Sequence, residues 1–109
     1  MTWSIVFYSD EVEAAIARMP ASIMARLIRL AERMEAFGPD LGMPHTRAMG
    51  EGLFELRVKG GAGSARVFYC TRLGNRIVVL HHFIKKSLKA PAKELAIARK
   101  RMKDVVNGT

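Results

Sequence analysis

The sequence feature that most constrains the fold is a succession of three β-rich runs in the second half of the chain. They span residues 53–58, 65–71 and 76–84, and each is rich in the β-branched and aromatic residues that favour strands. A glycine-rich stretch at 60–63 separates the first two runs, and a Gly-Asn turn signal at 74–75 separates the last two. Because connections this short join antiparallel neighbours, the sequence predicts a three-stranded antiparallel meander.

Two segments with helical periodicity precede these strands. Residues 3–8 are aromatic and β-branched and predict a first strand, after which Ser9 or Asp10 can cap a helix. Apolar residues then recur at spacings of three and four, first up to Pro20, which is expected to end that helix, and then up to Gly38. We therefore expect a helical hairpin packed on one face of the sheet.

The remaining segments predict a loop and a terminal helix. Gly, Pro and Asp interrupt residues 38–50 without periodicity, so we expect a loop there. Pro91 suits the first turn of a helix, and Leu95, Ala98 and Met102 follow it at helical spacing. The expected fold class is α+β, with the order β-α-α-β-β-β-α, an antiparallel sheet and the N-terminal helical hairpin on one of its faces.

The length and the cysteine content limit the organisation of the chain. Because 109 residues suffice for one compact core and not for two, residues 1–109 are expected to form a single domain. Cys70 is the only cysteine, so we expect a small buried strand residue and no internal disulfide. The chain begins without a secretory signal and has no apolar run that could cross a bilayer, so a cytoplasmic protein is expected.

The charge of the chain is concentrated in its second half. Residues 1–56 carry five arginines and eight acidic residues, a net charge of −3, whereas residues 57–109 carry thirteen Lys and Arg and two acidic residues, a net charge of +11. Such a basic surface attracts polyanions through counterion release, so nucleic acid and an acidic protein are the expected partners. A membrane partner is not expected, because no segment combines a strong apolar face with exposed aromatic residues.

Alternation along the predicted strands divides their side chains between a core face and a polar face. Leu56 and Val58 point to the core, whereas Glu55 and Arg57 point the other way. The polar groups expected near one another are Glu55, Arg57, Arg66, Lys85, Lys86 and one of the adjacent His81 and His82. Because a register shift of one residue exchanges the two histidines, the sequence leaves open which of them shares a face with Arg66.

These residue types can cleave RNA without a metal. Cleavage needs a base near the 2′-hydroxyl, an acid near the leaving oxygen and cations around the charge of the phosphorane. Histidine titrates in a suitable range, and crowded cations lower the pKa of a lysine. From spacing alone, the alternative is a surface salt bridge between Glu55 and Arg57 and a solvated edge at Lys85 and Lys86.

No metal or cofactor site is predicted. His45, His81 and His82 lack a cysteine partner at a ligand spacing. The glycine-rich stretch at 60–63 lacks the Gly-Lys-Ser/Thr ending of a phosphate-binding loop. We also find no Ser-His-Asp or Cys-His pattern with a recognisable nucleophile turn.

Three pieces of the sequence resemble those of a known toxin family. They are Leu-Phe-Glu-Leu-Arg at 53–57, Arg-Val-Phe-Tyr at 66–69 and Phe-Ile-Lys-Lys-Ser-Leu-Lys-Ala-Pro at 83–91. Together, at this spacing, they resemble the phage-derived Gp49-like/HigB branch of the RelE/ParE toxin superfamily. The resemblance runs from Leu53 to Ala98, and the first half of the chain agrees only in the order and length of its elements.

The resemblance implies a RelE-like fold and the function of a type II toxin–antitoxin toxin. Such a toxin enters the ribosomal A site and cleaves mRNA as a metal-independent endoribonuclease, which inhibits translation. Its implied partners are the ribosome, mRNA and a helix-turn-helix antitoxin that silences it. The alternative is a ParE-like DNA gyrase inhibitor that acts by binding without catalysis. The two share a fold, and the convergent cations favour RNA cleavage.

The resemblance also implies roles for single residues. Arg66 is expected to stabilise the transition state, and Lys85 and Lys86 are expected to act at the phosphate. The residues expected to bind RNA are Arg57, Lys89 and Lys93. Some RelE-type enzymes place a tyrosine after the last strand, whereas residues 87–109 contain neither Tyr nor His. The candidates for the general base are therefore His82 and Lys85, and His81 is a weaker candidate.

Overall fold

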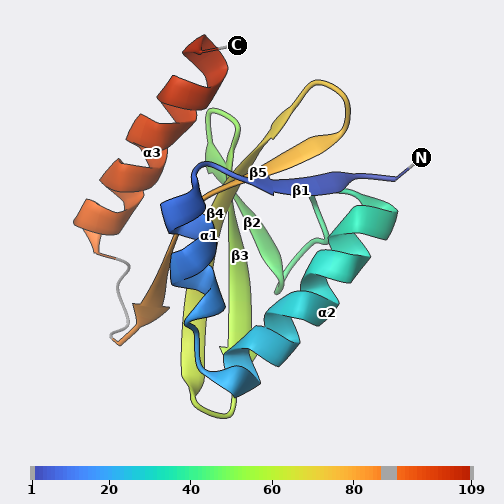
Figure 1. Ribbon diagram of the computed structural model, residues 1–109. Coiled ribbons are helices and arrows are strands. Elements are labelled where there is room, and N and C mark those ends of the chain that lie inside the picture. Colours follow the sequence, from blue (N-terminus) through green and yellow to red (C-terminus); the bar gives the residue numbers. More distant parts are fainter. Residues whose placement is uncertain (1, 87–90, 109) are drawn as a thin grey trace.

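A computed structural model describes residues 2–86 and 91–108 of the chain and arranges them around one five-stranded sheet (Figure 1). In chain order the elements are β1 (Ser4–Phe7), α1 (Asp10–Ala17), α2 (Ala21–Phe37), β2 (Thr46–Gly50), β3 (Leu53–Gly60), β4 (Gly63–Arg72), β5 (Arg76–Lys85) and α3 (Ala92–Asn107). In this described part of the chain, no helix has both the length and the apolar character needed to span a membrane. The order of the elements confirms the α+β fold class.

Local side-chain chemistry accounts for the ends of the first two helices. Ser9, rather than Asp10, caps α1, because its hydroxyl accepts a hydrogen bond from the Val12 amide at 3.2 Å. Pro20 lies beyond the end of α1 and is the N-cap residue of α2, so it separates the two helices. Gly38 ends α2 in a conformation with φ of 105°, which glycine adopts without strain.

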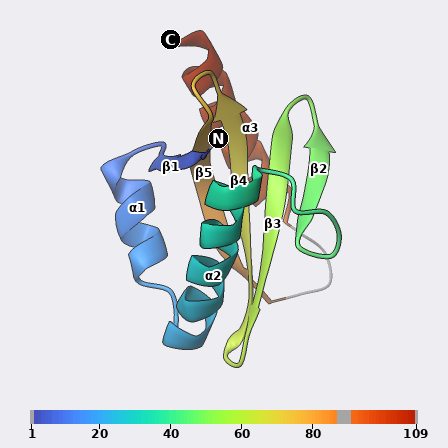
Figure 2. The same cartoon turned by 90° about the vertical axis from the view of Figure 1, so that its right-hand side faces the viewer.

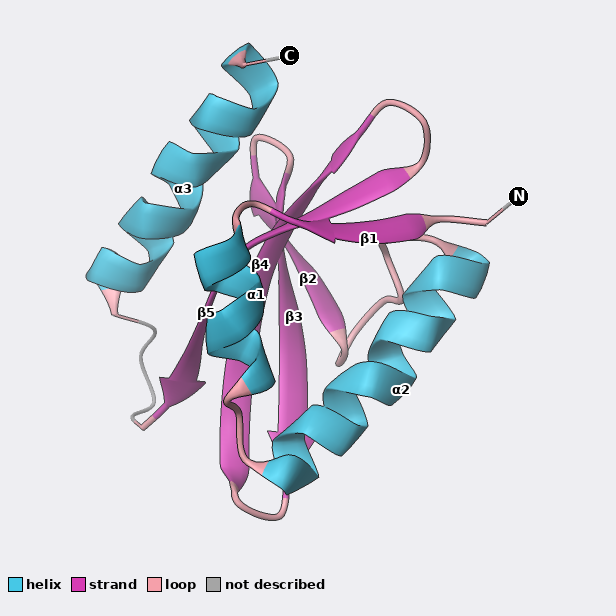
Figure 3. Ribbon diagram, viewed as in Figure 1, coloured by secondary structure: helices cyan, strands magenta, loops and turns pink. Residues whose placement is uncertain are grey.

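The sheet contains the predicted meander and differs from the expectation at both edges (Figure 3). Strands β3, β4 and β5 are antiparallel neighbours, as predicted. Within the segment expected to be a loop, β2 pairs antiparallel with β3. This strand is five residues long and does not alternate in polarity, so only its backbone pairing reveals it. At the other edge β1 pairs in parallel with β5, which makes the sheet mixed.

Helices cover both faces of the sheet (Figure 2). The predicted helical hairpin, α1 and α2, packs on one face, where it buries residues such as Ile23, Leu30 and Val67. The other face was expected to be polar, and that expectation is wrong where α3 covers it. Buried residues of this second core are Leu53, Phe68, Cys70, Val78, Leu80, Ala98 and Met102. The uncovered end of the same face keeps its polar residues.

A β-bulge in β5 decides which histidine lies on which face. In the register of β4 and β5, Phe68 lies opposite His81 and Tyr69 lies opposite Val79, so Leu80 is an extra residue. The regular alternation expected along this strand therefore fails after Val79. His81 lies on the face that α3 covers, together with Phe68, and His82 lies on the face that α1 and α2 cover.

Candidate functional site

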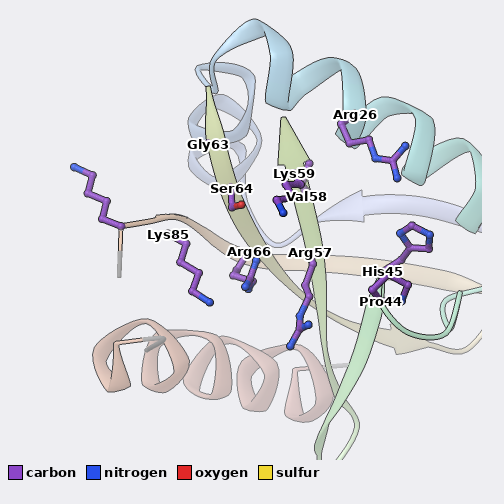
Figure 4. Close-up of a pocket in the computed structure, with 11 residues that line it drawn as sticks. Arg26, Pro44, His45, Arg57, Val58, Lys59, Gly63, Ser64, Arg66 and Lys85 are labelled. Carbon is purple, nitrogen blue, oxygen red and sulfur yellow. The ribbon is translucent and has the colours of Figure 1, made fainter. Parts of the chain in front are cut away.

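A cavity of about 750 Å³ opens at the end of the sheet nearest the turn between β3 and β4 (Figure 4). Its lining residues are Arg26, Pro44, His45, Arg57, Val58, Lys59, Gly63, Ser64, Arg66, Lys85 and Lys86. Six of them are Lys or Arg, and none of the described residues of the lining is acidic. A concave surface with one sign of charge concentrates a ligand of the opposite sign, so the cavity is suited to a polyanion.

Strand pairing brings the cations of the cavity together. Arg57 of β3 lies directly opposite Arg66 of β4, and Ser64 of β4 lies opposite Lys85 of β5. Alternate residues of a strand share a face, so Arg66 and Ser64 are neighbours on one face. Their cross-strand partners, Arg57 and Lys85, lie on the same face. Like charges directly opposite each other destabilise a sheet, so the arginine pair requires compensation.

Glu55 supplies this compensation from beneath the cavity. It is 3% exposed, and its Oε1 lies 3.5 Å from Nε of Arg57 and 3.7 Å from Nε of Arg66. One buried carboxylate thus holds two guanidinium groups and leaves part of their donors for a ligand. The alternative of a surface salt bridge between Glu55 and Arg57 does not fit the burial of Glu55.

Arg66 is the more enclosed of the two arginines, with a side chain that is 12% exposed against 32% for Arg57. Burial lowers the pKa of Arg66, Glu55 opposes this by raising it, and Arg57 lowers it further. An arginine keeps its charge under such shifts, so the cavity holds a poorly hydrated guanidinium. A phosphate oxygen that enters the cavity can replace the missing water with charge-assisted hydrogen bonds.

The structure gathers four of the predicted site residues and separates two others from them. Arg57, Arg66, Lys85 and Lys86 line the cavity. His82 is on the opposite face, in a smaller hollow with Val12 and Arg18, and Lys93 is an exposed residue of α3 away from the cavity lining. Lys89 lies outside the described residues. In the described chain, no group of three or more His, Cys, Asp or Glu residues is placed to hold a metal ion.

His81 shares the face of Arg66 but belongs to a different cluster. Its Nε2 lies 2.6 Å from Oε1 of Glu94, in α3. Arg101 of α3 donates to the Leu80 carbonyl at 2.8 Å and lies 5.3 Å from the centre of the Tyr8 ring. These contacts join α3 to β5 and to the segment after β1, so the cluster serves the packing of α3.

Three ionisable residues of the lining are not among the site residues that the sequence predicts. Arg26 belongs to α2, His45 lies just before β2, and Lys59 is near the end of β3. The sequence suggests His45 only as a possible metal ligand, and Arg26 belongs to a regularly spaced row of helix arginines on a different face from the apolar residues. Their placement follows from the packing of α2 and β2 against β3, which no local pattern reveals.

The burial of His82 gives a testable pH dependence of stability. Burial lowers the pKa of His82, as do His81 and Arg18, whereas Glu94 opposes this shift. The unfolded chain therefore binds a proton more readily, so the free energy of unfolding should be highest above about pH 6.5 and decrease as the pH falls below it. Urea titrations from pH 7.5 to 5 should show a weaker dependence for His82→Gln. An unchanged dependence in that variant would contradict the role of His82.

Comparison with known proteins identifies first the fold and then the family. The structure is similar to that of a double arginine-to-alanine mutant of the E. coli toxin RelE in the free state, with a TM-score of 0.59. The two share 15% sequence identity, and the match covers 94% of this chain and 99% of that chain. The fold is therefore RelE-like. No curated protein matches the sequence.

The sequence itself matches a family model over most of its length. The model describes the family "Phage derived protein Gp49-like" and matches residues 14–103. The chain therefore belongs to the Gp49-like family, the family that the three sequence pieces indicated.

Proposed function

We propose that this protein is the toxin of a type II toxin–antitoxin pair, a cytoplasmic endoribonuclease that cleaves mRNA on the ribosome. The observation that carries the proposal is the cavity in which Arg57, Arg66 and Lys85 converge over the buried Glu55. Membership of the Gp49-like family and the RelE-like fold support it. A protein that inhibits gyrase by binding has no need of a cavity lined by converging cations.

The proposed reaction is the attack of an RNA 2′-hydroxyl on the adjacent phosphate. The O2′–P bond forms, the P–O5′ bond breaks, and the products are a 2′,3′-cyclic phosphate and a 5′-hydroxyl. Arg66, with Arg57 beside it, stabilises the charge that develops on the phosphorane oxygens. The Lys85 ammonium gives a proton to the leaving 5′-oxygen, and Lys86 holds the neighbouring phosphate.

The ribosome is proposed to present the RNA in a reactive geometry. The cavity is open to solvent and does not enclose a strand, so a free RNA strand would be poorly oriented in it. We therefore expect efficient, codon-linked cleavage of translated mRNA and little cleavage of naked RNA. Primer extension on mRNA from a reconstituted translation reaction, with and without ribosomes, measures this difference. Efficient site-selective cleavage of naked RNA would contradict ribosome dependence, and growth arrest without any cleavage would favour gyrase inhibition.

The proposed antitoxin is a helix-turn-helix protein with an acidic segment. The net charge of +11 in residues 57–109 favours such a segment by long-range attraction. An antitoxin that blocks the cavity would compete with RNA for the same cations. Association that slows as salt rises to the physiological range would support this electrostatic contribution.

Replacing Glu55 with glutamine tests whether the buried carboxylate positions the arginines. The variant keeps the size of the side chain but lacks the charge that holds Arg57 and Arg66. We expect cleavage to slow about ten- to a hundredfold, because interactions with charged groups contribute about 1.5–3 kcal/mol. Binding of an uncleavable 2′-O-methyl RNA should tighten and become more salt-dependent, since the site gains net positive charge. Glu51→Gln, an exposed turn residue, is the control; slower cleavage with weaker binding would instead indicate a general loss of structure.

A further inference from the structure

The reaction proposed above requires a group that takes the proton from the 2′-hydroxyl. The two histidines that the sequence suggests for this role, His81 and His82, do not line the cavity. His82 lies on the face covered by α1 and α2, and His81 is bound to Glu94 beneath α3. Glu55 is buried and engaged with two arginines. Among the described residues that line the cavity, His45 is the only histidine, and no carboxylate is present.

The backbone of β3 places His45 in line with the arginines. Thr46 pairs with Leu56 in the register of β2 and β3, and one position further the His45 carbonyl accepts a hydrogen bond from the Arg57 amide at 2.8 Å. Arg57 in turn lies opposite Arg66. His45, Arg57 and Arg66 therefore form a row across three neighbouring segments, with about 4.8 Å between adjacent backbones.

The two ends of this arrangement carry different chemical groups. Figure 4 shows His45 on one side of β3 and Arg66 and Lys85 on the other. In-line displacement at phosphorus places the attacking and the leaving oxygen on opposite sides of the phosphate. A base and an acid must therefore flank the cations that hold the phosphate.

We propose that His45 is the general base of the RNA cleavage reaction. This inference rests on the proposed function and adds a catalytic residue to it. A neutral imidazole nitrogen of His45 takes the proton of the 2′-hydroxyl as O2′ attacks phosphorus, and the P–O5′ electron pair leaves with a proton from Lys85. The products are the 2′,3′-cyclic phosphate, the 5′-hydroxyl, a His45 imidazolium and a neutral Lys85, which exchange protons with water before the next turnover.

The surroundings of His45 suit an exchange of this kind. Hydrogen bonds fix the backbone of His45 on both sides. Its amide donates to the Gly42 carbonyl at 3.0 Å, and its carbonyl accepts from the Arg57 amide. The charged groups that share the cavity with it are Arg26 from α2, Arg57 and Lys59 from β3, Arg66 from β4, Lys85 at the end of β5 and Lys86 directly after it. Its side chain is half-buried, so it can reach both a bound RNA strand and water.

The test compares His45→Gln with the wild-type protein in the ribosome-bound cleavage reaction. We expect the single-turnover rate to fall about a hundred- to ten-thousandfold, the usual contribution of a general base. Binding of 2′-O-methyl RNA, which lacks the attacking hydroxyl, should stay within twofold of wild type. The acidic limb of the pH–rate profile, where a protonated base cannot accept a proton, should disappear in the variant. Added imidazole should partly restore the rate of His45→Gly.

The outcomes separate the role of His45 from the function itself. If wild type cleaves and His45→Gln cleaves equally fast with the same acidic limb, His45 is not the base and the proposed function stands. If His82→Gln removes the acidic limb instead, the base lies on the other face of the sheet. If wild type binds 2′-O-methyl RNA but cleaves no translated mRNA, the proposed function fails and the assignment of His45 fails with it. A melting curve for each variant identifies any loss of rate that comes from unfolding.

Discussion

Replacing Arg66 with alanine should reduce ribosome-bound RNA cleavage about a hundred- to a thousandfold and abolish growth arrest. The reason is the loss of a positioned charge at the phosphorane, which costs about 3–4 kcal/mol in the transition state. Arg66 suits this role because its side chain is only 12% exposed and is positioned by an ion pair with Glu55, whose Oε1 lies 3.7 Å from Nε of Arg66. Single-turnover cleavage, together with growth of cells that express each variant without antitoxin, measures the effect.

The fold of this variant should survive, because Glu55 keeps Arg57 as a partner at 3.5 Å. The cleavage rate of Arg66→Lys should lie between those of wild type and Arg66→Ala, since an ammonium keeps the charge but lacks the planar fork of a guanidinium. Arg76→Ala, at the far end of the sheet where its side chain is exposed, is the matched control and should cleave at the wild-type rate. A folded Arg66→Ala that cleaves normally would show that the active site lies elsewhere.

Replacing Phe68 with alanine should lower the free energy of unfolding by about 3–5 kcal/mol, the usual cost of removing a buried phenyl ring. Phe68 is fully buried in the core between the sheet and α3. Its ring stacks on that of Phe83 with centres 5.9 Å apart, so the substitution removes an aromatic contact as well as buried area. Urea titration of both proteins gives the difference.

The chain offers a matched control for this experiment in Phe37, whose ring is 79% exposed at the end of α2. Phe37→Ala should change the free energy of unfolding by less than about 0.5 kcal/mol. A loss below about 1 kcal/mol in Phe68→Ala would mean that α3 does not pack on the sheet as a second core. Such a result would also argue against the division of this face of the sheet into an apolar end covered by α3 and an open, polar end.

The structure bears on the placement of the predicted site residues in the strands, and it agrees with the sequence for some of them and not for others. The sequence predicts Arg57 and Arg66 in one polar cluster, and the pairing of β3 with β4 places them directly opposite each other. The same reasoning failed in β5, because the bulge at Leu80 shifts all later residues by one position. One extra residue therefore decided that His82 faces the helical hairpin.

The sequence by itself determined the features that depend on neighbours along the chain. Helical periodicity, a helix cap at Ser9 or Asp10, the turn at 74–75 and the three long strands all arise from interactions over a few residues, and the three sequence pieces indicated the family. Only the tertiary structure decided which groups meet in the cavity. His45 and Arg26 reach it because β2 and α2 pack against β3, and these contacts join residues that are far apart in sequence. Local helix and strand propensities do not predict such contacts, because their free energy comes from burial and pairing that exist only once the chain has folded.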